Sequence, residues 1–159
     1  MIIVAVATML AGGAPARALH DPGSERARCV LGAEVAGDAE RRDISVSIDF
    51  PSHLVEGDSF DWRVSVRNLR DTPVELRFRN TSRASVELCA RGRLAYAYAR
   101  VANPAIGQLT LKPQEVRVFA LPENGRRIAA GEYLLGAYVA IVGSPVARRV
   151  VRVSEKLGA

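Results

Sequence analysis

Residues 58–80 read DSFDWRVSVRNLRDTPVELRFRN, and this stretch decides the fold class. Apolar residues occupy every second position in two short runs, with polar or charged residues between them. Because side chains alternate across a β-strand, each run predicts a strand with one buried and one solvated face. Residues 69–73 separate the runs and contain Asp71 and Pro73, which favour a turn. Antiparallel strands with one solvated face are typical of a β-sandwich.

The rest of the chain continues this pattern. Further strand-like runs lie at residues 44–50, 85–90, 94–98, 109–111, 116–120, 133–142 and 146–153. Turn signals at 91–93 and 122–125 separate some of them, and no amphipathic helix of ordinary length interrupts the series. Seven to nine short strands at this spacing predict an all-β, immunoglobulin-like antiparallel β-sandwich. A chain of 159 residues that is 48% apolar is long enough to bury the core of one such domain.

The first 18 residues have the features of a secretory signal peptide. Residues 2–10 are apolar, and Ala16 and Ala18 are the small residues that a signal peptidase reads. The apolar run is far shorter than the ~20 residues that cross a bilayer, so we expect no integral membrane span. We expect an exported protein, periplasmic or extracellular, with residues 19–42 as a loosely ordered leader and 43–159 as the sandwich. The alternative is an apolar N-terminus on a cytoplasmic protein.

Cys29 and Cys89 are the only two cysteines of the chain. In an oxidising compartment such a pair is a candidate disulfide, which would fix the leader to the domain. Closing that loop stabilises the fold by about 4 kcal/mol on the chain-entropy model. The alternative is two unpaired thiols. A metal site is not expected here, since neither cysteine has a close Cys or His neighbour.

Arginines occupy the polar sides of the two alternating runs. They are Arg63, Arg67, Arg77 and Arg79. If the runs form one hairpin, the four side chains share its outer face and can attract an acidic protein or an anionic envelope component. Nucleic acid is not an expected partner for an exported protein. The alternative is a solvated face on which Asp61 and Glu75 pair with arginines across the strands.

Aromatic residues suggest a second contact surface and two structural anchors. Tyr96 and Tyr98 alternate with alanines on an expected edge hairpin, where they form a flat recognition patch or, alternatively, half-buried sheet residues. Trp62 alternates in step with buried valines and is expected in the core. Tyr133 opens a long strand after Gly131, the position of a tyrosine corner in Greek-key sandwiches.

Residues 60–140 resemble the bacterial BsuPI-type intracellular proteinase inhibitor domain. The matching positions are Asn68, Pro73, Val74, Gly92, Leu111, Pro113, Gly131 and Tyr133. The resemblance implies an immunoglobulin-like sandwich and, as a function, protease inhibition. The matching residues serve turning and packing, so none of them is assigned an inhibitory role.

The sequence offers no catalytic constellation. Its two histidines, His20 and His53, are far apart and lack a second ligand at metal spacing, and no nucleophile elbow or phosphate-binding loop occurs. We therefore expect a non-catalytic binding module without a cofactor or metal. A BsuPI-type inhibitor that uses residues 100–104 or 122–131 as its exposed loop is the alternative. A small metal carrier or enzyme is a weaker one.

Overall fold

The computed structural model describes residues 29–51, 53–58, 61–79, 81–98, 107–122 and 128–156. The expected signal peptide, His20 and residues 100–104 lie outside these ranges. The strands are β1 Ile44–Asp49, β2 Leu54–Val55, β3 Trp62–Asn68, β4 Val74–Phe78, β5 Ala84–Ala90, β6 Arg93–Ala97, β7 Gly107–Leu111, β8 Val116–Leu121, β9 Gly131–Val139 and β10 Ala147–Ser154, and Ala33–Val35 form a short 3-10 helix. Only the two-residue strand β2 was not predicted. No helix among the described residues is long and apolar enough to cross a membrane.

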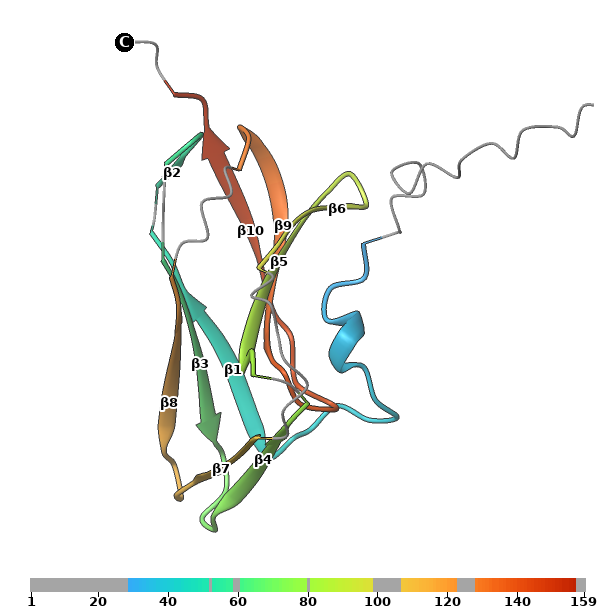
Figure 1. Ribbon diagram of the computed structural model, residues 1–159, viewed down its shortest axis with the longest axis vertical. Coiled ribbons are helices and arrows are strands. Elements are labelled where there is room, and N and C mark those ends of the chain that lie inside the picture. The colour runs from blue at the N-terminus through green and yellow to red at the C-terminus, as the bar shows by residue number, and fades with distance from the viewer. Residues whose placement is uncertain are drawn as a thin grey trace, which may run out of the picture.

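The strands form two facing layers, as Figure 1 shows. One layer has the order β2-β10-β9-β5-β6, the other has the order β1-β3-β8, and β4 pairs with β7 at the lower end of the view. All pairs are antiparallel except β2 with β10. The chain changes layer between β1, which pairs with β3, and β2, which pairs with β10. This arrangement is an immunoglobulin-like β-sandwich, as the sequence predicted.

The core lies between the layers and is built by the predicted alternation. Trp62 is 1% exposed, and its ring lies 5.9 Å from that of Phe50 and 6.3 Å from that of Tyr96, which comes from the opposite layer. The Tyr133 hydroxyl donates to the Ala129 carbonyl oxygen at 2.8 Å, so the predicted tyrosine corner is confirmed.

The predicted hairpin between the two alternating runs is wrong. β3 pairs with β1 and β8, whereas β4 pairs with β7 in the separate two-stranded sheet. Alternation determines which face of a strand is buried, but it does not determine the neighbouring strand. The predicted tight turn after β5 does join a hairpin, β5–β6, because Arg91 and Gly92 both adopt positive φ and so suit a two-residue connection.

Asn68 at the end of β3 directs the chain away from a hairpin. Its side chain is fully buried, and its Nδ2 donates to the carbonyl oxygens of Thr72, Leu111 and Lys112 at 2.9, 3.2 and 2.9 Å. Its Oδ1 accepts from the Arg70 N–H at 2.8 Å. The amide therefore ties the connection after β3 to the turn between β7 and β8.

Residues 29–43, here called the N-terminal strap, lie against the outer face of the five-stranded layer (Figure 1). The predicted disulfide between Cys29 and Cys89 is confirmed, and the Cys29 N–H also donates to the Gly92 carbonyl oxygen at 2.8 Å. Further along, the Arg41 N–H donates to the Gly143 carbonyl oxygen at 2.7 Å. The leader was expected to be loosely ordered except around Cys29, whereas the sandwich also holds it at Gly32, Val35 and Arg41.

A buried carboxylate fixes the centre of the strap. Glu87 is 8% exposed, and it accepts from the Gly32 N–H at 2.9 Å and from the Tyr138 hydroxyl at 2.8 Å. Burial raises the pKa of Tyr138, so the hydroxyl remains a donor to Glu87 at ordinary pH. Beside this contact Leu31 packs on Gly136, where a Cβ would meet the Leu31 side chain at 2.9 Å. The strap therefore needs a glycine at this position of β9.

Candidate binding surfaces

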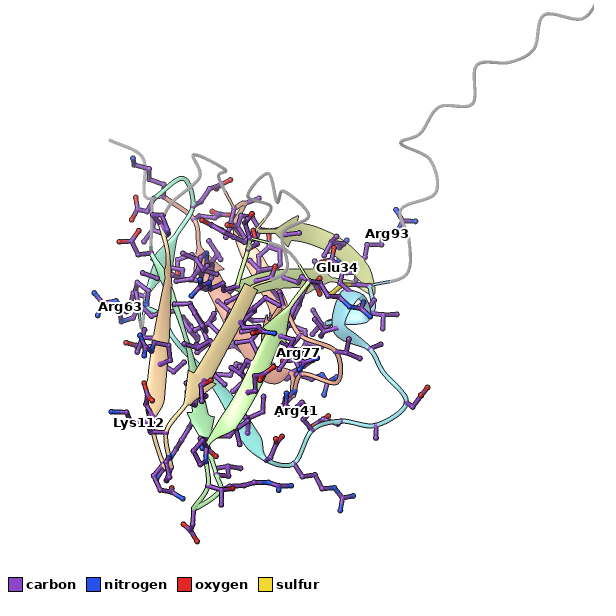
Figure 2. The ribbon with its side chains drawn as sticks, turned by 60° about the horizontal axis from the view of Figure 1, so that its bottom comes forward. Glu34, Arg41, Arg63, Arg77, Arg93 and Lys112 are labelled. Carbon is purple, nitrogen blue, oxygen red and sulfur yellow. A yellow bond between two sulfur atoms is a disulfide. The ribbon has the colours of Figure 1, made fainter. Side chains whose placement is uncertain are left out.

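The four predicted arginines lie on two surfaces rather than one. Arg63 and Arg67 belong to β3 in the three-stranded layer, whereas Arg77 belongs to β4 and Arg79 follows it. In Figure 2, Arg63 and Arg77 project from different parts of the molecule. The expected single arginine stripe is therefore absent, because the hairpin that would have joined the two strands does not form.

Arg77 and Arg79 both bond to other residues of the chain. The Arg77 guanidinium donates to Glu75 on the same strand, and this hydrogen bond raises the pKa of Arg77. Arg79 donates from Nη1 to the Glu34 carbonyl oxygen of the strap at 3.3 Å. The pairing of Glu75 expected across the hairpin is thus replaced by a pairing within β4.

Arg63 and Arg67 lie on the outer face of β1, β3 and β8, here called the β3 face. The pairing register arranges this face in three rows, which are Ser45–Arg67–Val116, Ser47–Ser65–Val118 and Asp49–Arg63–Ala120. Neither arginine forms an ion pair with a described residue, although Arg67 donates from Nη2 to Gln114 Oε1 at 3.0 Å. The face combines short side chains with two guanidinium groups.

The apolar residues of β8 lie on the β3 face. The alternation groups Val116, Val118 and Ala120 on one side of the strand, and that side faces outward, with Val116 51% and Val118 52% exposed. The opposite side carries Leu121 toward the core, where it is 7% exposed. β8 therefore presents small apolar side chains to solvent beside the two arginines of β3.

The expected tyrosine patch does not form on the surface. Tyr96 and Tyr98 are each only 7% exposed, since their rings point into the sandwich. β6 is the edge of its sheet, as predicted, but it presents Leu94 rather than the tyrosines, with Leu94 46% exposed. A recognition patch made of the two rings is therefore not available, and the half-buried alternative describes them better.

A second exposed apolar feature was not found in the sequence. The cross-strand neighbours Val150, Leu134, Cys89 and Leu94 form a row across the outer face of β10, β9, β5 and β6, here called the apolar row. Val150 is 64% and Leu134 43% exposed. The continuous apolar run of residues 133–142 predicts burial on both faces or a central position in the sheet, and β9 is central, between β10 and β5. The N-terminal strap covers part of its outer face and leaves Leu134 in solvent.

The described residues contain no group of three His, Cys, Asp or Glu side chains that could hold a metal ion. His53 lies next to β2, in a cleft that Asp49 and Arg149 also line. The acidic groups with altered ionisation lie at turns. The Arg41 hydrogen bond lowers the pKa of Asp43, and the Lys112 backbone N–H lowers the pKa of Glu115. Asp43 also forms an ion pair with Arg41, and Glu115 forms one with Arg117.

The comparisons with known proteins do not assign the chain to a family. No family model matches the chain, and no curated protein matches it. The BsuPI-type identity is therefore not supported.

Several solved structures resemble the fold. The CARDB domain of a Pyrococcus furiosus protein, determined in complex with di-metal ions, is 19% identical and aligns over 72% of this chain and 94% of its own, with a TM-score of 0.42. The C-terminal domain of Wzt is 15% identical over 74% and 77%, with a TM-score of 0.45. A Listeria innocua beta-glucosidase is 15% identical over 70% of this chain but only 16% of its own, with a TM-score of 0.41. At these scores the sandwich assignment rests on strand order and register.

Proposed function

We propose that this protein is an exported, non-catalytic binding module and that its β3 face contacts a partner protein. The observation that carries the proposal is the exposure of Val116 and Val118 beside Arg63 and Arg67. Interface centres are enriched in arginine and in apolar groups that can be desolvated. Ser47 and Ser65 keep the middle of the face flat, so that a partner surface can approach the backbone.

Three features support the individual parts of this proposal. The Cys29–Cys89 disulfide fits an oxidising compartment, and hence export. The described polar groups at and beside the β3 face include the guanidinium groups of Arg63 and Arg67, the serine hydroxyls and the Gln114 amide, which suit contact with a partner. An unpaired arginine on a flat sheet face can bind a carboxylate of a partner in the bidentate manner.

The proposal is tested by cross-linking the full chain in native envelope extract, identifying the partner by mass spectrometry and measuring the affinity of variants for it. We expect Arg63→Glu and Val118→Asp each to weaken binding at least tenfold, which corresponds to about 1.4 kcal/mol. Arg77→Glu is the matched control, because it makes the same change of net charge on β4. Equal losses for Arg63→Glu and Arg77→Glu would indicate nonspecific charge attraction and contradict the proposal. The proposal would also be contradicted if the chain bound anionic vesicles as tightly as it binds the partner protein.

Protease inhibition remains an alternative for which no described residue provides a specific observation. Its two candidate loops lie largely outside the described ranges. Stoichiometric inhibition of an envelope protease by the full chain would establish it and would make the loops, rather than the β3 face, the primary site.

A further inference from the structure

Along one edge of β10, where the chain crosses between the layers, no described strand lies beside most of its length. β10 pairs with β9 from Ala147 to Val153, but β2 reaches only Val153 and Ser154 on its other side. Among the described residues no strand therefore pairs with the outer edge of β10 from Ala147 to Arg152. Such an edge is a template to which another strand can add.

The direction of the free backbone groups follows from the contact with β2. The Ser154 carbonyl oxygen accepts from the Glu56 N–H at 2.8 Å on this edge. In a strand, the N–H and C=O groups of alternate residues point to the same side. Arg152, Val150 and Arg148 therefore direct their backbone groups toward the free edge, whereas the residues between them bond to β9.

The free edge borders an open cleft of about 650 Å³ between β10 and the end of β1. Ile48, Asp49 and Phe50 line one side, and residues 149–152 line the other, with His53 and Leu54 near β2. The space next to the edge is thus open to an added chain. Asp49 is the negatively charged residue that faces this space, and Arg149 and Arg152 are the positively charged ones.

The outward side chains of β10 specify what such a chain must carry. They follow the order Arg148, Val150, Arg152. Arg148 and Arg149 have no ion pair with a described residue, and Arg152 pairs with Glu132 at 3.0 Å in an exposed contact of the kind that contributes little to stability. A complementary strand therefore has acidic residues beside the two outward arginines and an apolar residue beside Val150.

The apolar row provides a second argument for the same occupant. Val150 is its end member, and Leu134 and Leu94 continue it across the sheet. An apolar residue on an added strand would extend this row and cover the Val150 side chain, which is 64% exposed. Pairing with a second copy of the chain is disfavoured, because an antiparallel pair centred on Val150 places Arg148 of each copy opposite Arg152 of the other.

We propose that the free edge of β10 accepts an extended acidic–apolar–acidic segment of a partner protein as an additional strand. The segment bonds to the backbone of Val150, and its acidic residues lie beside Arg148 and Arg152. β10 belongs to the layer opposite the β3 face, and the two sites meet at Asp49, which ends one row of that face and also lines the cleft. Binding at each site is tested at a residue the other does not contain, Val118 for the β3 face and Val150 for the free edge, so the two proposals can fail independently.

The test uses a synthetic, blocked peptide, acetyl-TETVTET-amide, titrated into the isotope-labelled full chain and followed by NMR. We expect saturable shifts centred on the amides of Arg148, Val150 and Arg152, with affinity that falls as salt is raised. Two matched peptides serve as controls. TKTVTKT reverses the charges, and TETPTET lacks the central N–H that would bond to Val150; each is expected to bind at least tenfold more weakly.

Matched protein variants separate the edge from the rest of the molecule. Val150→Pro removes an N–H that points to the edge and leaves the bonds to β9 in place, since proline is tolerated at such positions. Arg148→Glu changes only the charge and covers the case in which the proline variant fails to fold. Both are expected to weaken TETVTET binding at least tenfold, while Arg77→Glu, which makes the same charge change on β4, leaves it unchanged. The proposal is overturned by equal binding of TKTVTKT, by shifts centred elsewhere, or by no saturable shift at millimolar peptide.

Discussion

Replacing Asn68 by alanine tests whether one buried amide determines the path of the chain after β3. The side chain donates to the carbonyls of Thr72, Leu111 and Lys112 and accepts from the Arg70 N–H. The Leu111 contact is buried, and a carbonyl left there without a donor costs about 1–3 kcal/mol. The three remaining bonds are partly buried and together contribute about 2 kcal/mol. We expect Asn68→Ala to lower the free energy of unfolding by about 3–5 kcal/mol.

Urea denaturation followed by tryptophan fluorescence measures this loss, since Trp62 is the only tryptophan. With a slope of about 2 kcal/mol per molar urea, the midpoint should fall by about 2 M. Asn68→Asp keeps an oxygen for Arg70 but loses the three donations, so it should be at least as destabilising. Ser65→Ala, on the outer face of the same strand, should stay within about 0.5 kcal/mol. A loss below about 1 kcal/mol for Asn68→Ala would refute the reasoning, because water would then replace the amide.

Three further predictions concern the corner, the strap and an ion pair. Tyr133→Phe removes only the hydroxyl that donates to the Ala129 carbonyl, so thermal unfolding should show a loss of about 1 kcal/mol and no change in fold. Replacing both Cys29 and Cys89 by alanine should lower the free energy of unfolding by up to about 4 kcal/mol. Hydrogen exchange should then become faster in residues 29–43 before it does in the sandwich. Unchanged exchange in residues 29–43 would contradict a strap held by the disulfide. The pKa of Asp43 is lowered below 3.8 in the folded state. The stability that ionised Asp43 adds to the fold is therefore complete above about pH 4 and is lost as the pH falls through the folded-state pKa. Urea midpoints measured from about pH 2.5 to 6 should fall less steeply at the acid end for Asp43→Asn than for the unchanged chain.

The β3 face and the free edge of β10 are exposed for different reasons. The β3 face is flat because serines occupy the row between the arginines, and it is exposed because nothing in the described chain covers it. The outer face of the other layer is partly covered by the strap, which covers Cys89 and leaves Val150, Leu134, Leu94 and the free edge of β10 in solvent. The two surfaces meet at Asp49, and the rest of each lies on a different layer, so we expect two separate contacts.

Local sequence determined much of this protein. The alternating runs placed β3 and β4 correctly and named their buried faces, because a period of two is a property of each strand alone. The turn at Arg91 and Gly92 predicted the β5–β6 hairpin, since two strands joined by only two residues pair with each other. The tyrosine corner at Tyr133 and the disulfide were likewise predicted and confirmed, because both are common anchors of small β-sandwiches.

Tertiary structure alone decided the rest. Alternation states which side of a strand is apolar, but not which strand lies beside it, so Arg63 and Arg77 were placed on one face although they lie on separate sheets. It also could not tell that the apolar side of β8 faces water, since that depends on what the other layer supplies to the core. The free edge of β10 arises where β2 ends after two residues. Such features depend on contacts between segments distant in sequence, and no local pattern encodes them.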